Sequence, residues 1–280
     1  MVNKIHLLFF LSSFLFACGF EPSTDKANLP TSSGKYGEVL VVVDTAYQKG
    51  DLKSTLDSIF LAPLSGLPQM EPQFRTSFVS PSSFKSILKR ARNILKIDIK
   101  KESKNNVEVV RDVWAKDQLL IRVIASSKED VARILKKNTQ TLRDYFNEEE
   151  IKRLQLRHKG KKNQDANVVL LDKFNIQLDV PPGFVRMMDS SNGIWFKKEK
   201  QIGQHQVLQG IAIYTEDYNS DSTFYEKTMI NSRNHFTKRF ILGPRESSYM
   251  QVYDEFIPIS KEVNLSGLYA VEYRGLWKMK

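Results

Sequence analysis

The sequence predicts an α+β protein with mixed and antiparallel sheets, helices packed on one face of the sheets, and two subdomains. Three observations indicate this class. Strand-like and helix-like segments occur in both halves of the chain. Several neighbouring strand-like segments are separated only by short polar turns, which suits antiparallel pairing. A strongly polar stretch, "RHKGKKNQDAN", divides the chain in the middle.

These features divide the chain into five segments. The expected segments are a lipoprotein signal peptide at 1–17, a flexible tether at 18–33, an N-terminal α+β subdomain at 34–156, a basic linker at 157–167 and a C-terminal α+β subdomain at 168–280.

The chain begins with a short apolar run. Leu7 to Phe16 is apolar apart from two serines, and Lys4 precedes it. A helix of about ten residues is about 15 Å long, half of the roughly 30 Å hydrocarbon core of a bilayer, so the run is too short to span it. Its length and position are typical of the apolar region of a signal peptide.

The only cysteine of the chain directly follows this run, in a sequence that resembles a bacterial lipobox. Leu15 lies three residues before Cys18 and the small Ala17 directly before it, whereas Phe16 departs from the usual small or β-branched residue. The resemblance implies acyl chains on Cys18, and two or more chains anchor a protein stably. Gly19 stands in place of the Asp that retains lipoproteins in the inner membrane, which favours the outer membrane. We expect the protein to face the periplasm, with the leaflet left open. The alternatives are an ordinary signal peptide with a coincidental cysteine and an N-terminal core strand.

The N-terminal subdomain is predicted to form around one buried strand, "GEVLVVVD" at 37–44, because a continuous apolar run is typical of a strand buried on both faces. The other elements expected here are a helix at 51–61, a strand at 74–79, a helix capped by Ser80, a strand at 93–99, two antiparallel strands at 107–115 and 117–125, and a long helix from a capping box, Ser126 with Glu129, to about Leu156.

After the linker the strand and helix pattern starts again. A second capping box, Thr223 with Glu226, predicts a helix over 224–240 that Gly243 and Pro244 terminate. The strands expected around it are at 174–180, 193–199, 206–217, 249–259 and 267–279.

The chain carries a formal net charge of +10, with basic residues concentrated at 85–104 and 152–162. Export argues against nucleic acid as a partner, and the first cluster lacks the interleaved aromatic residues that bind single strands by stacking. We expect solvated faces at both clusters. The alternative is contact with anionic lipid head groups or another envelope polyanion. The expected partners are the membrane, through acyl chains on Cys18, and an envelope protein or an anionic lipid surface, and no nucleic acid.

The histidines give no sign of a metal or catalytic site. His158, His205 and His235 lack the i, i+4 spacing of a helical zinc pair, so we expect surface histidines and no cofactor. A hydrolase with a dispersed triad stays an alternative, and it would place His205 or His235 beside a serine and an acid in one cavity. A lipid carrier is a third possibility, and it would need a large apolar cavity between sheet and helices.

Among the carboxylates, Asp44 follows the buried strand, where an α/β enzyme can keep a catalytic acid. We expect it to cap a turn instead. Glu148 and Glu150 are expected to be solvated.

The proline-rich loop "GLPQMEPQF" at 66–74 is interpreted as a rigid crossover that packs Leu67, Met70 and Phe74 onto the sheet, with a recognition surface as the alternative. The three tryptophans are expected to pack in the core or at sheet edges rather than to bind a ligand: Trp114, Trp195 and Trp277.

Six stretches together resemble the bacterial lipoprotein family named domain of unknown function 4837. They are Ser32–Asp44, Gly66–Phe74, Arg92–Ile99, Asp112–Gln118, Ile241–Met250 and Arg274–Trp277, and they extend over nearly the whole chain after the signal peptide. The resemblance implies an exported, lipid-anchored protein and brings no activity or catalytic residue. The expected function is a non-catalytic binding or accessory lipoprotein of the cell envelope.

Overall fold

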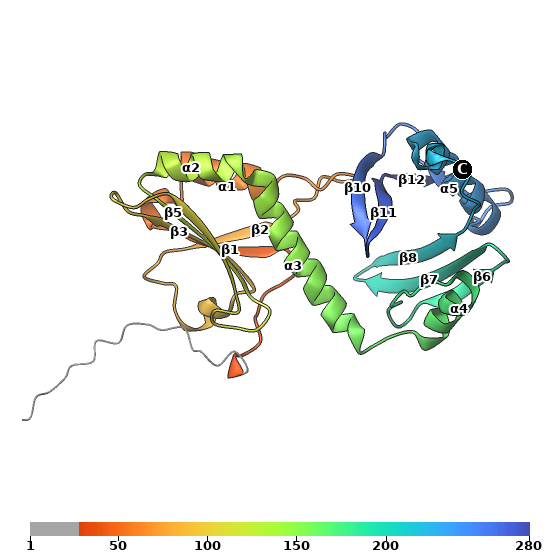
Figure 1. Cartoon of the computed structure of the whole chain (residues 1–280), viewed down its shortest axis with the longest axis horizontal. Coiled ribbons are helices and arrows are strands. Elements are labelled where there is room, and N and C mark those ends of the chain that lie inside the picture. Colours follow the sequence, from red (N-terminus) through yellow and green to blue (C-terminus); the bar gives the residue numbers. More distant parts are fainter. Residues whose placement is uncertain (1–27) are drawn as a thin grey trace, which may run out of the picture.

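The computed structural model describes residues 28–280, which form two lobes: an N-lobe, residues 28–160, and a C-lobe, residues 161–280 (Figure 1). Both lobes combine sheets with helices, so the predicted α+β class with mixed sheets is confirmed. Cys18 and the predicted signal peptide lie outside the described residues. Of the helices in the described part of the chain, none is both long and apolar enough to cross a bilayer.

The N-lobe is organised around a five-stranded sheet in which β1 is a buried, interior strand. β1 pairs in parallel with β2 on one side and β3 on the other, and only β4 runs antiparallel to its neighbour. The strand order is β2 (Arg75–Val79), β1 (Glu38–Val42), β3 (Asn93–Ile99), β5 (Leu119–Ala125) and β4 (Asn106–Arg111). The predicted buried strand and the predicted antiparallel pair are both confirmed.

Three helices cover one face of this sheet: α1 (Asp51–Phe60), α2 (Lys128–Lys137) and α3 (Thr139–Lys159). In α1, Leu52, Leu56 and Ile59 are spaced so that they share one side of the helix, and all three are buried against the sheet. The largest side chains of this core are Phe60, Phe74 and Phe146, whose rings meet edge to face at centroid distances of 5.8–6.1 Å.

The long helix predicted after β5 is divided at Asn138. Ser127, and not Ser126, is the N-cap of α2, because its hydroxyl accepts from the main-chain N–H of Asp130. The side chain of Asn138 donates to the carbonyl of Ile134 over 2.8 Å, which closes α2 locally and competes with a continuous helix. α3 then starts directly and runs to Lys159.

The helix predicted from Ser80 does not form. The Ser80 hydroxyl accepts from the N–H of Ser83, as a cap would, but the turn stops at Lys85, whose backbone is extended. A short 3-10 helix, residues 86–90, follows. Competing hydroxyl bonds among Ser80, Ser82 and Ser83 satisfy this turn without a helix.

The buried face of α3 is apolar in the first part of the helix and charged in the second part. Glu150 is 1% exposed, so the expectation that it would be solvated is wrong. It belongs to the Glu150 cluster, which we define as Arg92, Asn93, Glu150 and Arg153. Asn93 Nδ2 donates to Glu150 Oε1 over 2.7 Å, and Arg153 Nη1 donates to the same oxygen over 3.1 Å.

The two arginines of the Glu150 cluster hold α3 against the amino end of β3. Arg92 Nη2 lies 2.9 Å from Glu150 Oε2, an ion-pair contact without hydrogen-bond geometry. Arg153 donates to the main-chain oxygens of Arg92 and Asp117 over 2.8 and 2.6 Å. Burial lowers the pKa of the Arg153 guanidinium, although the nearby Glu150 favours its charged form.

The C-lobe begins with α4 (Gln164–Phe174), which the sequence analysis did not identify. Its three-stranded antiparallel sheet has the order β6 (Val185–Asp189), β7 (Gly193–Ile202) and β8 (His205–Tyr214). α4 packs on one face of this sheet and α5 (Glu226–Phe240) on the other. Two further pairs complete the lobe: β9 (Met250–Val252) with β12 (Trp277–Met279), and β10 (Ile259–Leu265) with β11 (Leu268–Arg274).

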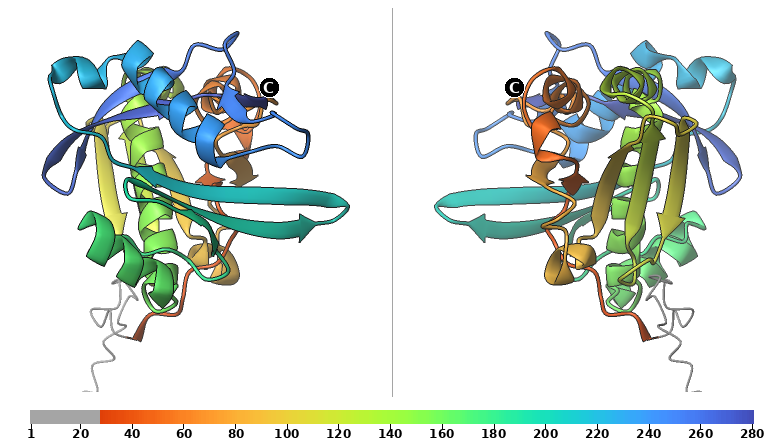
Figure 2. Two further views of the ribbon diagram at one scale, coloured as in Figure 1. Left: turned by 90° about the vertical axis from the view of Figure 1, so that its right-hand side faces the viewer. Right: turned by 90° about the vertical axis from the view of Figure 1, so that its left-hand side faces the viewer.

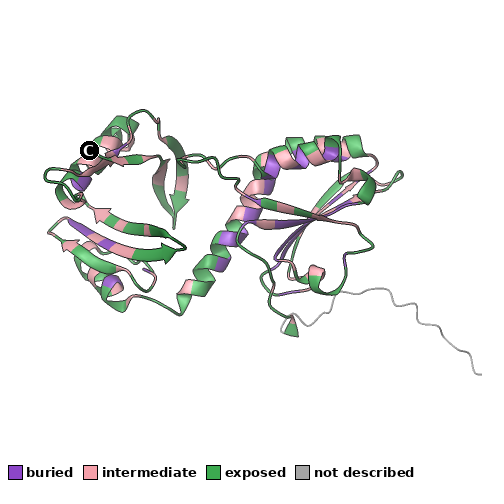
Figure 3. Ribbon diagram, turned by 180° about the vertical axis from the view of Figure 1, so that it is seen from behind, coloured by how far each residue is buried: buried purple, intermediate pink, exposed green. Residues whose placement is uncertain are grey.

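The C-lobe buries much less of its chain than the N-lobe does. Figure 3 shows the buried residues concentrated in the N-lobe sheet and helices, whereas the C-lobe strands are mostly exposed or intermediate. Figure 2 shows the long β7–β8 hairpin projecting beyond the rest of the lobe. The C-lobe elements are therefore held by smaller contact areas.

Several local expectations for the C-lobe are wrong. The stretch 157–167, expected as a linker, is mostly helical, because α3 continues to Lys159 and α4 starts at Gln164. Residues 174–180 do not form a strand, since the chain leaves α4 through Asn175 in a left-handed conformation. Thr223 lies in a 3-10 turn, and α5 begins at Glu226 without a side-chain cap.

The end of the predicted tether is attached to the N-lobe. Ser33 N–H donates to the carbonyl of Arg90 over 2.8 Å, and the Arg90 guanidinium donates to the carbonyl of Thr31 over 3.0 Å. Of the stretch 18–33 expected to be flexible, residues 31–33 are therefore fixed by main-chain bonds.

The proline-rich loop after α1 reaches the C-lobe rather than covering the sheet. Phe74 is buried as expected, but Leu67 is 38% exposed and Met70 is 87% exposed, so their predicted packing onto the sheet is wrong. A Cβ added to Gly66 would lie 3.6 Å from the backbone of Arg274, at the end of β11. Figure 1 shows this loop, in orange, extending from the N-lobe to β10 and β11.

Candidate functional site

A cavity of about 630 Å³ lies in the C-lobe between the β7–β8 sheet, α5 and the last strands of the chain. We call it the C-lobe cavity. Strand alternation explains its floor: Leu208, Gly210 and Ala212 point to the same face of β8, and the last two have little or no side chain. A Cβ added to Gly210 would lie only 3.0 Å from the Trp195 indole nitrogen, so a larger residue would displace this ring. Small residues thus leave the sheet face hollow.

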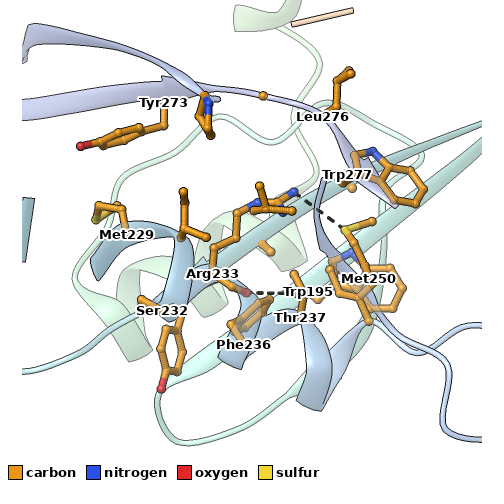
Figure 4. Close-up of a pocket in the computed structure, with 18 of the residues that line it drawn as sticks. Trp195, Met229, Ser232, Arg233, Phe236, Thr237, Met250, Tyr273, Leu276 and Trp277 are labelled. Atoms are coloured by element: carbon orange, nitrogen blue, oxygen red, sulfur yellow. Dashed lines mark hydrogen bonds between the residues drawn. The ribbon is translucent and has the colours of Figure 1, made fainter. Parts of the chain in front are cut away.

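α5 forms the second wall. Met229, Arg233 and Phe236 recur at helical spacing and therefore face the cavity together (Figure 4). Phe236 is buried, and its ring packs on Tyr214 of β8 at a centroid distance of 5.3 Å. This contact fixes α5 across the sheet.

The third wall comes from segments near the end of the described chain. Met250 and Val252 belong to β9, and Trp277 of β12 pairs with Val252. Tyr273 of β11 completes this wall, and its hydroxyl donates to the carbonyl of Phe224 over 2.7 Å. Trp277 is 51% exposed and Leu208 49% exposed, so the cavity is open to solvent.

Arg233 is the only charged residue that lines the C-lobe cavity within the described part of the chain. Figure 4 shows its guanidinium extended from α5 toward Met250, and Nη2 lies 3.9 Å from the Met250 sulfur. Arg233 is an exposed residue that also lines the cavity, and partial desolvation by the cavity walls lowers the pKa of its guanidinium. No carboxylate of the described residues forms an ion pair with it.

One acid beside α5 is already engaged in another contact. Ser232, which also lines the cavity, donates from its hydroxyl to Glu216 over 2.5 Å. The Arg233 main-chain oxygen accepts from the Thr237 hydroxyl over 2.9 Å, a bond within α5 that does not involve the guanidinium. The cavity is thus apolar apart from a few hydroxyls and one cation.

A second, smaller cavity of about 360 Å³ lies at the carboxyl ends of β1 and β3. The chain passes from β1 to β2 on one side and then returns to β3 on the other, so this is the switch point at which α/β proteins often bind ligands. Asp44 is occupied there, because Oδ1 accepts from the N–H of Ala46 over 2.9 Å, and the capping interpretation is confirmed.

Asp98 lines the same small cavity and is also paired. Lys96 and Arg122 donate to its two oxygens over 2.6 Å each. Burial alone would raise the pKa of this carboxyl, but the two cations outweigh it, so its pKa lies below the ordinary value. Both acids of the small cavity are therefore held in structural contacts.

The histidines lie on three different elements and, within the described residues, none lines either cavity. His158 is on α3 and half-buried, while His205 on β8 and His235 on α5 are exposed. The geometry that a dispersed hydrolase would need, with His205 or His235 in a cavity, is not formed. No group of three or more His, Cys, Asp or Glu in residues 28–280 is arranged to hold a metal ion.

The residues of the C-lobe cavity were not predicted from the sequence. Trp195 and Trp277 were expected to pack in a core or at an edge, yet both line the cavity, whereas Trp114 packs on Phe84 in the N-lobe. Arg233 could not be recognised as a site residue from the sequence, because an arginine in a basic helix is common. The alternation of small residues in β8 was the one available hint.

Two family models match the chain. Residues 32–159 match the Domain of unknown function (DUF8532), and residues 162–280 match the Domain of unknown function (DUF4837). The boundary falls between α3 and α4. Four of the six stretches that resemble DUF4837 lie before residue 119 and therefore outside its match. The family model thus covers less of the chain than those stretches implied. The searches of curated proteins and of solved structures found no match.

Proposed function

Residues 162–280 belong to the Domain of unknown function (DUF4837) family, and from this premise we propose that the chain is a lipid-anchored, non-catalytic binding protein of the cell envelope. The family description names no activity, so the proposal depends on the cavity and on the N-terminal sequence. The C-lobe cavity carries the binding role. Its volume lies within the range of about 300–1,000 Å³ that is usual for small-molecule sites.

The composition of the cavity supports binding rather than catalysis. Its walls are mainly Trp, Phe, Met, Leu and Val side chains, and among the described residues no histidine or carboxylate lines it. General acid–base and nucleophilic mechanisms need such groups within hydrogen-bond reach of the substrate. An apolar cavity with few polar groups is suited to holding a ligand.

Filling the cavity should abolish this binding. Ala212→Phe places a large ring beside Trp195 on the hollow face of β8, so we expect at least a ~10-fold loss of affinity for the neutral fluorescent probe N-phenyl-1-naphthylamine. The measurement is a fluorescence titration of the full chain carrying Cys18→Ser, purified without detergent. Gln209→Phe, on the opposite face of β8, should bind normally. Equal affinities of both variants would refute the cavity as the site.

The N-terminal sequence supports the lipid anchor, in the outer membrane facing the periplasm. Cys18→Ser removes the only sulfur to which a diacylglyceryl group could be attached, so the variant should lose all incorporation of a labelled fatty acid. Metabolic labelling followed by gel analysis measures this. A Ser13→Ala variant, which keeps Cys18, is the control and should be labelled. Labelling of the Cys18→Ser protein would exclude this anchor.

A further inference from the structure

Arg233 sets a requirement on what the C-lobe cavity binds. A guanidinium that lines an apolar cavity loses part of its hydration, and proteins normally compensate such a charge with a carboxylate or another anion. Four arginines of the N-lobe follow that rule: Arg92 and Arg153 contact Glu150, Arg111 contacts Glu149, and Arg122 contacts Asp98. Arg233 has instead only a weak contact with the Met250 sulfur.

The position of Arg233 makes the cation available to a ligand. Its guanidinium lies inside the cavity and keeps solvent contact, so an anion can reach it through the open mouth. The guanidinium binds carboxylate and phosphate through two parallel hydrogen bonds, which are stronger when water is excluded. The surrounding walls then contact the apolar part of the same molecule.

We propose that the C-lobe cavity binds a small amphiphilic anion, with its apolar body against Trp195, Phe236 and Trp277 and its single anionic group on Arg233. This inference rests on the proposed binding function and adds the chemical class of the ligand. A purely apolar ligand would displace water from the guanidinium without pairing its charge, which disfavours it. A cationic ligand would be repelled.

Two probes with the same aromatic body test the charge requirement. 1-Anilinonaphthalene-8-sulfonate carries one sulfonate, whereas N-phenyl-1-naphthylamine is neutral. We expect the Cys18→Ser chain to bind both and to prefer the anionic one. Arg233→Met, which keeps the length of the side chain, should weaken the anionic probe at least ~10-fold, or about 1.4 kcal/mol, and leave the neutral probe within about 2-fold. Arg233→Lys should restore part of the preference.

Arg239→Met is the matched control. Arg239 lies on the same helix, does not line the cavity and stacks on Phe240, so its loss should change neither affinity. Competition of the anionic probe by dodecanoate and by dodecyl phosphate, but not by dodecanol, then shows which head group Arg233 prefers.

The outcomes separate this inference from the proposed function. An equal effect of Arg233→Met on both probes, or an equal effect of Arg239→Met and Arg233→Met on the anionic probe, would overturn the inference while binding itself stands. If neither probe binds, or if Ala212→Phe leaves both affinities unchanged, the binding function is wrong. Thermal unfolding of each variant shows whether a loss of binding comes from a loss of folding.

Discussion

Replacing Phe146 with alanine should lower the free energy of unfolding of the N-lobe by about 3–5 kcal/mol. Phe146 is fully buried, and its ring lies 5.8 Å from that of Phe60 and 6.1 Å from that of Phe74. Together with Leu142, it joins α3 to the core formed by α1 and the sheet. The substitution removes most of this buried surface and leaves a cavity that the surrounding strands cannot fill.

Urea denaturation measures this loss, and hydrogen exchange of N-lobe peptides shows where it occurs. Leu154→Ala is the matched control, because Leu154 lies on the same helix and is 43% exposed, so we expect less than ~0.5 kcal/mol. A change below ~1 kcal/mol for Phe146→Ala would show that α3 does not depend on this aromatic contact.

Glu150→Gln should destabilise the N-lobe by a similar amount, about 3–5 kcal/mol. The substitution keeps the shape of the side chain and removes only its charge. Arg92 and Arg153 would then lie close together in the interior without the carboxylate that both contact. Removing one partner of a buried ion pair is costly because the remaining charge is desolvated and uncompensated.

Glu148→Gln provides the control, since it makes the same chemical change two residues away on an exposed part of α3. We expect it to alter stability by less than ~0.5 kcal/mol. The Glu150→Gln effect should also persist at high salt, because buried pairs are screened little. Similar stabilities of the two variants would mean that water reaches the cluster and solvates the arginines.

The periodicity of apolar residues correctly predicted those elements whose buried face can be recognised from their own sequence. The apolar run of β1 and the spacing of Leu52, Leu56 and Ile59 in α1 each contain enough information to identify a strand and a helix. The capping boxes were less reliable: Ser127 caps α2 in place of Ser126, and Thr223 does not cap α5. Adjacent residues of the same type compete for one cap, and the choice depends on contacts outside the motif.

Helix α4 was not predicted from the sequence for a different reason. Its polar first turn, "QDAN", reads as a continuation of the basic stretch, so the sequence suggested a linker there. Asn163 caps the helix by accepting from the N–H of Ala166 over 3.1 Å, and burial of Ala166 and Leu170 against β7 stabilises it. This stabilisation comes from tertiary contacts, which a window of local sequence does not contain.

The amino-acid sequence by itself determined the α+β class, the buried strand β1 and the helix α1. Only the tertiary structure decided that Glu150 is buried and that Arg233 faces an apolar cavity. The physical reason is that the contacting residues are far apart along the chain. Glu150 contacts Arg92, and Arg233 lies beside Met250 and faces β8 across the C-lobe cavity. Local periodicity reports which face of an element is apolar, whereas the environment of a charged side chain depends on what folding brings opposite to it.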